Sequence, residues 1–215
     1  MSPFDYTDEE IAEYIKKEVR IFSKLRNSLS ALKLDELNKA ERSALIYVKK
    51  TYENLYDEYI PCLERIVKKN FKNVKTPKEN VSDSEVKKFV KDFLETPDHV
   101  TKYIFNDETE RKRARMFESL ISMMIAGKKD YRAELKVCMR LWTRQIQQTA
   151  DDITMASLIE SYKKSGVKKV VWHTQGDHKV CEDCKKLDKK VFDINNIPEI
   201  PQHYACRCYV TPYLP

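Results

Sequence analysis

Hydrophobic residues recur at intervals of three and four along most of the chain, which is the period of an amphipathic α-helix. The first such run extends from Ile11 to Leu29, and Thr7 or Asp8 stands where a helix cap is expected. A second run, residues 37–66, keeps its register across Pro61, which predicts either one kinked helix or two helices that meet there. The amino-terminal part of the chain is therefore predicted to be helical.

Capping signals delimit the next helices. Ser82 and Glu85 form a capping box ahead of an apolar run that Pro97 closes. A further helix is expected to end at Gly127, because glycine readily adopts the left-handed conformation that ends many helices. The polar stretch 75–80, just before the capping box, is the best candidate linker in this half of the chain.

The second half begins with a segment, residues 129–165, that contains neither Pro nor Gly. Its apolar residues alternate between spacings of four and three, which predicts one long helix of up to about 50 Å packed against one or two partners. Gly166 is expected to end it. The period then changes, and the runs 170–172, 191–192 and 209–210 predict three short strands.

Together these patterns predict an α+β fold that is mostly α. A helical region (1–127) and a long connecting helix (128–165) lead into a small metal-binding α+β domain with short strands (166–215). Only 3 of the 215 residues are Gly and 34% are charged, which suits a helix-rich protein. A final domain of about fifty residues is marginal without a staple, so a metal would supply much of its stability.

The cysteines supply that staple. Cys181 and Cys184 form a C-x-x-C pair, and His203, Cys206 and Cys208 form a second close group. Two short clusters separated by a loop suit a tetrahedral zinc ion. Cys206 is the surest third ligand. The fourth is either His203, which we prefer, or Cys208, since side chains two apart in an extended segment face the same way.

The first residues and the net charge of the chain limit the possible functions further. The first residues lack the basic start and apolar core of a secretory signal, and no apolar run in the sequence approaches the roughly 20 residues that cross a bilayer. We therefore expect cytoplasmic synthesis without a membrane partner, where reduced cysteines favour metal over disulfides. The net charge of +6 is not concentrated in one part of the chain, which favours solvated helix faces over a DNA-binding patch.

A longer pattern surrounds the two clusters. A Trp ends a short apolar strand, an Asp precedes C-x-x-C, Leu-Asp follows it, and a Val-Phe pair and a Pro lead to His-x-x-Cys-Arg-Cys. The residues are Trp172, Asp177, Cys181, Cys184, Leu187, Asp188, Val191, Phe192, Pro201, His203, Cys206, Arg207 and Cys208. This combination resembles the carboxy-terminal domain of the Mu F-like phage minor head (head morphogenesis) family. That family usually has Gly where Lys189 stands, and often has His-Pro-Asn-Cys where this chain has Tyr204 and Ala205 between His and Cys.

The resemblance implies a structural protein of the phage head that acts in head morphogenesis. Such a protein is expected in the virion, in the capsid interior near the portal, and in the host cytoplasm during assembly. Its expected partners are the portal protein and other capsid or scaffold proteins, with contact to double-stranded DNA during packaging or ejection left open. The residues expected to support the metal domain are Trp172, Asp177, Leu187, Asp188, Phe192 and Arg207.

Two other functions stay open. The first is a zinc-knuckle nucleic-acid-binding protein; its supporting basic residues are Lys185, Lys186, Lys189, Lys190 and Arg207. The second, less favoured, is a small zinc-dependent hydrolase or nuclease with Asp177 or Asp188 as its base. Four protein ligands would leave no open position on the metal, and the chain has no H-E-x-x-H, phosphate-binding Gly loop or Ser-His-Asp set. We therefore expect no enzymatic activity and no catalytic residues.

Overall fold

The computed structural model describes residues 2–73, 81–95, 107–176 and 180–214, with the backbone alone for residues 73 and 107–114. The candidate linker at 75–80, the helix end at Pro97 and the support residue Asp177 lie outside the described residues.

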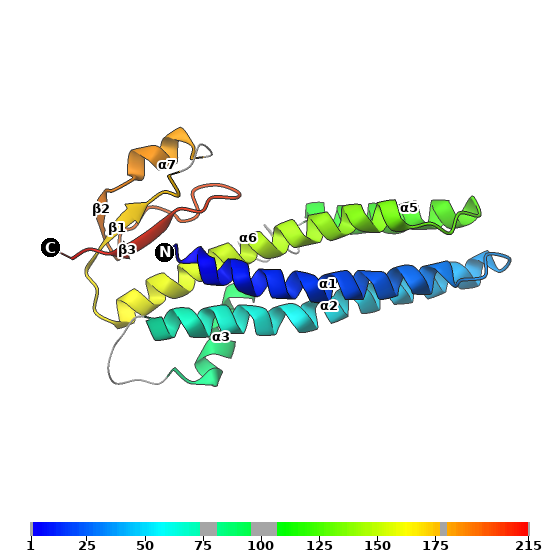
Figure 1. Cartoon of the computed structure of the whole chain (residues 1–215), viewed down its shortest axis with the longest axis horizontal. Helices are drawn as coiled ribbons and strands as arrows, with labels where there is room; N and C mark the ends of the chain where they lie inside the picture. Colours follow the sequence, from blue (N-terminus) through cyan, green and yellow to red (C-terminus); the bar gives the residue numbers. More distant parts are fainter. Residues whose placement is uncertain (1, 74–80, 96–106, 177–179, 215) are drawn as a thin grey trace. The chain divides into compact units, whose positions relative to one another are not determined.

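The described part of the chain is mainly helical, and a small sheet lies near its carboxyl end (Figure 1). This confirms the predicted α+β, mostly α class. The long helices are α1 (Phe4–Ser30), α2 (Leu37–Asn73), α3 (Asp83–Glu95), α5 (Asp107–Ile125) and α6 (Arg132–Lys164). Within the described ranges, none of the helices combines the length and the apolar character that crossing a lipid bilayer requires.

Helix α1 begins one turn earlier than predicted. The N–H of Phe4 donates to Oγ of Ser2 at 3.3 Å, so Ser2 takes the capping position. The prediction of Thr7 or Asp8 as the cap was wrong. Phe4 is only 1% exposed, and extending the helix to this residue lets its ring be buried.

The two alternatives at Pro61 are resolved in favour of one helix. α2 continues through Pro61, which is exposed to solvent. The predicted capping box at the start of α3 is also confirmed. The N–H of Ser82 donates to the Glu85 carboxylate at 3.1 Å, and the N–H of Glu85 donates to Oγ of Ser82 at 3.3 Å.

The ends of α5 and α6 follow the predicted glycine signals. Gly127 and Gly166 both have positive φ, of 69° and 75°. After α6 the N–H of Val167 donates to the carbonyl of Tyr162 at 3.0 Å, which closes the helix end. The long helix predicted between residues 129 and 165 is thus confirmed.

The chain packs as two compact units. One comprises Met1–Asp8, Leu63–Phe93 and Gln148–Pro215, and the other comprises Glu9–Cys62 and Leu94–Gln147. α1, α2, α3 and α6 contribute residues to both units. The predicted division at residues 127 and 165 describes the order of segments along the chain, and it stays a prediction.

In the unit that contains Glu9–Cys62, polar groups are buried within the helix packing. The Trp142 indole N–H donates to the Tyr14 hydroxyl at 2.7 Å, and the Tyr14 ring packs edge-on against that of Tyr59. Glu18 is fully buried beside them. Its Oε1 accepts from the Thr143 hydroxyl at 2.8 Å, while Oε2 has no hydrogen-bond partner among the described residues. Burial raises the pKa of Glu18 to about 7.

The other unit contains the sheet. Its strands are β1 (Lys169–His173), β2 (Val191–Asp193) and β3 (Tyr209–Pro212), in the order β2-β1-β3 with both pairings antiparallel. The short helix α7 (Glu182–Leu187) lies between β1 and β2 in the chain. All three predicted strands are therefore present.

Trp172 is central to the core of this unit, with no exposed surface, and its ring contacts Phe192 edge-on at 6.3 Å between centroids. α6 is covered on all of its faces in this unit, because every residue from 148 to 155 is buried. The apolar residues spaced three and four apart would by themselves bury only one face of that stretch. The buried cluster comprises Phe4, Met155, Leu158, Tyr162, Val170, Trp172, Cys184, Ile194, Cys206, Cys208 and Val210.

Candidate metal centre

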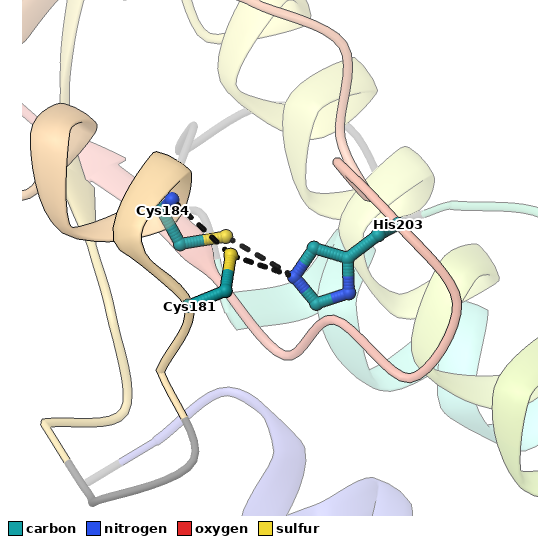
Figure 2. Close-up of side chains that lie close together, drawn as sticks. All are labelled: Cys181, Cys184 and His203. Atoms are coloured by element: carbon teal, nitrogen blue, oxygen red, sulfur yellow. Dashed lines mark hydrogen bonds between the residues drawn. The ribbon is translucent and has the colours of Figure 1, made fainter.

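The first pair of donors is held by the start of α7. Cys181 is the N-cap residue, and its sulfur accepts the N–H of Cys184 at 3.4 Å. This hydrogen bond lowers the pKa of the Cys181 thiol, because the bond stabilises a thiolate. Cys184 lies one turn into the helix and is only 2% exposed, and burial raises the pKa of its thiol. Both sulfurs lie on the same side of the turn (Figure 2).

His203 faces this pair from a loop distant in sequence. Its Nε2 lies 3.3 Å from Sγ of Cys181 and 3.4 Å from Sγ of Cys184 (Figure 2). The other ring nitrogen, Nδ1, lies 2.9 Å from the Tyr204 carbonyl oxygen, which can only accept. Nδ1 therefore carries the proton, and in the neutral ring the Nε2 lone pair is directed at the two sulfurs. The same bond raises the pKa of His203.

The remaining two cysteines also lie near Cys184. Sγ of Cys184 and Sγ of Cys206 are 3.8 Å apart. Donor atoms fall into two overlapping groups, Cys181–Cys184–His203 and Cys184–Cys206–Cys208, and within each group all of them lie within 4.8 Å of one another. The structure thus brings together all five residues that the sequence nominated, in a cluster that could hold a metal ion.

Cys206 and Cys208 influence each other's pKa. A hydrogen bond between them lowers the pKa of Cys206 and raises that of Cys208. A cavity of about 350 Å³ opens over the cluster, and its lining includes Gln175, Val180 and Ala205.

Two of the predicted support residues fix the turn between α7 and β2. The Asp188 carboxylate accepts the N–H of Thr174 at 2.8 Å and the Thr174 hydroxyl at 3.2 Å. This ties the segment after β1 to the end of α7. Leu187, the last residue of α7, packs against the buried cluster around Trp172.

Both departures from the Mu F-like pattern fall at left-handed backbone positions. Lys189, where the family usually has Gly, has φ 63°, and its N–H donates to the Trp172 carbonyl at 2.8 Å. Ala205, where the family often has Asn, has φ 60°, and its N–H donates to Oε1 of Gln148 at 2.6 Å. Gly and Asn adopt this region most readily. The turns are therefore formed here by residues that fit them less well.

Arg207 is anchored by partners that sequence reasoning missed. Its guanidinium donates to both oxygens of Asp8 at 2.9 and 3.0 Å and lies 4.6 Å above the ring of Phe4. Its Nε lies 3.3 Å from Oδ2 of Asp151, close enough for an ion pair but not aligned as a hydrogen bond. The only signal for these partners was the pair of adjacent carboxylates, Asp151 and Asp152, among the apolar residues of α6.

The lysines of the knuckle are engaged within α7. Lys185 pairs with Glu182 and Lys186 pairs with Asp183, both at 2.7 Å and one helical turn apart. Each of these lysines thus has a neighbouring negative charge.

Comparison with known proteins gives one family match. A family model described as Phage Mu protein F like protein matches residues 83–211, which is more than half of the chain. The matched region contains all five residues of the cluster. Neither the curated proteins nor the solved structures gave a match.

Proposed function

This chain belongs to the family of phage Mu protein F like proteins, and from that premise we propose that it is a structural protein of the phage head that acts in head morphogenesis. The observation that carries the proposal is the family match, which spans the whole cysteine and histidine cluster. In this proposal the protein lies inside the capsid near the portal, with the portal protein and other capsid or scaffold proteins as partners.

The cluster holds one zinc ion through Cys181, Cys184, His203 and Cys206. Zinc binds sulfur at about 2.3 Å and imidazole nitrogen at about 2.0 Å, so a tetrahedron requires S···S edges of about 3.8 Å and S···N edges of about 3.5 Å. Three of the six edges are close to these values, the S···S distance of 3.8 Å and the S···N distances of 3.3 and 3.4 Å, and they support this fit. Cys206 does not lie within 4.8 Å of both Cys181 and His203, so it has to approach them when the metal binds. When bound, the metal supplies a cross-link between α7 and the loop that precedes β3.

Cys208 serves this site as a hydrogen-bond donor. The hydrogen bond between the two thiols, which lowers the pKa of Cys206, supports Cys206 as the thiolate ligand. Cys208 is 5% exposed, so its S–H is shielded from water. In this proposal His203, whose Nε2 lies 3.3 Å from Sγ of Cys181 and 3.4 Å from Sγ of Cys184, completes the donor set in preference to Cys208.

A structural role is favoured over hydrolysis by what the neighbouring groups already do. Four protein donors complete a tetrahedral zinc without an open position. Asp188, the described carboxylate that a hydrolase would need as a base, holds the backbone N–H and the hydroxyl of Thr174. It acts in this proposal as an orienting group for the turn.

Nucleic-acid binding through the knuckle is less well supported. A phosphate-binding surface needs cations that are available to the phosphates. Lys185 and Lys186 are each paired with an acidic side chain of the same helix. These four side chains therefore add no net positive charge to the surface of α7.

The zinc is tested by elemental analysis of protein purified without added metal. We expect one zinc per chain in the wild type, and loss of that zinc in Cys181→Ser, Cys206→Ser and His203→Ala. Cys208→Ala should retain it with weakened affinity, because only the hydrogen bond to Cys206 is lost. Retention in His203→Ala with complete loss in Cys208→Ala would reverse the assignment of the fourth ligand.

The role in the head is tested on particles. Mass spectrometry of purified virions should detect the chain, and the purified protein should bind the purified portal protein. Absence from virions together with no binding to the portal protein would reject the proposed role, whatever the metal content.

A further inference from the structure

Arg207 lies between Cys206 and Cys208 in the sequence, but its side chain contacts residues outside the candidate metal centre. Cys206 and Cys208 are 5% exposed and belong to the buried cluster. The guanidinium between them reaches Asp8 at the start of α1, 199 positions earlier in the sequence, and Asp151 of α6. All of these residues belong to the same compact unit.

The contact with Asp8 is a hydrogen-bonded ion pair between two partly exposed side chains. One guanidinium nitrogen donates to both carboxylate oxygens, at 2.9 and 3.0 Å. The guanidinium also covers the face of the Phe4 ring at 4.6 Å, and that ring meets Tyr209 of β3 edge-on. The first turns of α1 are thus held against the segment that carries Cys206 and Cys208.

Asp151 gives Arg207 a second anchor on α6. Its side chain is only 5% exposed, whereas that of Arg207 is 33% exposed. A carboxylate this buried is costly without a nearby positive charge. Arg207 supplies that charge, and this attraction favours the position of the guanidinium beside Asp151.

The loop is held at one further point. Gln148 of α6 accepts the N–H of Ala205 and donates to Asp152 at 2.7 Å. The segment between His203 and Cys208 is therefore positioned by α6 and by the start of α1. The other two donors are held by α7, Cys181 as its N-cap and Cys184 within its first turn.

We propose that Arg207 is a positioning residue that couples the metal centre to the start of α1. It holds Cys206 where the ligand pair of α7 can meet it, by binding Asp8 and Asp151 with its side chain. The inference rests on the proposed zinc site and adds to it an intramolecular partner, the first turns of α1. Because coupling is reciprocal, zinc should stabilise those turns as much as they favour zinc binding.

The experiment compares full-length wild type with Arg207→Gln, Arg207→Lys and Asp8→Asn. Lys68→Met is the matched control, since it removes an exposed ion pair with Asp83 in the same unit without touching the cluster. Zinc affinity is measured by competition with a chelating dye. Thiolate-to-metal absorption of the cobalt-loaded proteins reports the coordination itself, and hydrogen exchange of residues 4–8 is measured with and without zinc.

Zinc affinity should fall 10- to 100-fold in Arg207→Gln, as is typical when a group that orients a ligand is lost, and about tenfold in Asp8→Asn. Arg207→Lys should fall between the wild type and Arg207→Gln, because it keeps the charge but has only one nitrogen to serve both Asp8 and Asp151. The control should match the wild type. Zinc should slow exchange at residues 4–8 in the wild type and have little effect there in Arg207→Gln.

Two results would overturn the inference in distinguishable ways. Lower thermal stability with unchanged zinc affinity and unchanged cobalt spectra in the Arg207 and Asp8 variants would show a purely structural contact, and the zinc site would stand. Failure of the wild type to bind zinc would remove the proposed site and the inference together.

Discussion

Glu18 makes the stability of the helical packing around it depend on pH. This carboxyl is fully buried on α1, and one of its oxygens has no hydrogen-bond partner in the described part of the chain. Burial disfavours the charged form and raises its pKa to about 7 from the ordinary value of 4.5. The folded protein therefore holds this proton more tightly than the unfolded chain does.

The sign and size of the effect follow from proton linkage. Stability from this group is fully present below about pH 4.5 and is lost as pH rises to about 7, because the folded state must then bury a charge. The difference between the two pKa values, at about 1.4 kcal/mol per unit of pKa, corresponds to about 3 kcal/mol. Replacement by Gln, which cannot ionise, should remove this loss.

The measurement is urea unfolding of wild type and Glu18→Gln from about pH 4.5 to about pH 8.5 at constant zinc. Trp142 lies close to Glu18, and Trp172 is the only other tryptophan. A Trp172→Phe background therefore lets Trp142 fluorescence report unfolding near Glu18. Subtracting the free energy of unfolding of the wild type from that of Glu18→Gln at each pH cancels any pH dependence of the metal centre.

We expect Glu18→Gln to gain about 3 kcal/mol relative to wild type between the two ends of this pH range. Glu9→Gln, an exposed change on the same helix, should stay close to wild type at every pH. A difference between wild type and Glu18→Gln that does not change with pH would refute a raised pKa for Glu18.

Three further changes test the backbone and the buried polar network. Lys189→Gly should raise stability by about 1 kcal/mol in thermal unfolding by relieving the left-handed backbone, whereas Lys190→Gly should lower it; equal effects would contradict the strain. Pro61→Ala should add about 1–3 kcal/mol in urea unfolding, because it restores a helix hydrogen bond at an exposed site, and no gain would mean that α2 accommodates the proline without cost. Gln148→Leu should cost about 2 kcal/mol in the same assay by leaving the Ala205 N–H unpaired, and unchanged stability would argue against that bond.

Most of the secondary structure could be predicted because its signals are local. The capping box at Ser82 and the helix ends at Gly127 and Gly166 depend on residues within a few positions of each other. The same reasoning placed the cap of α1 incorrectly. Burial of Phe4 against the core of its unit is a tertiary effect, and the helix begins at Phe4 with Ser2 in the capping position.

The clustering of the five candidate donors could also be predicted, because they occur in two short groups with the spacing of zinc ligands. Spacing alone left His203 and Cys208 as alternatives. The structure adds what each of them faces: Nε2 of His203 faces two sulfurs, whereas the sulfur of Cys208 groups with those of Cys184 and Cys206. Such orientations depend on contacts between segments and have no signature in spacing. The choice of His203 as the fourth ligand stays a prediction.

By itself the sequence determined the helices, the three strands and the five candidate donors, since hydrophobic period, caps and ligand spacing act over a few residues. Only the tertiary structure decided how these parts meet. It brought Asp8 to Arg207 across 199 positions, and it buried the carboxylate of Asp151 beside the same guanidinium. Which polar side chains pair at that separation depends on how whole helices and strands pack. Local sequence patterns, which extend over a few residues, do not contain that information.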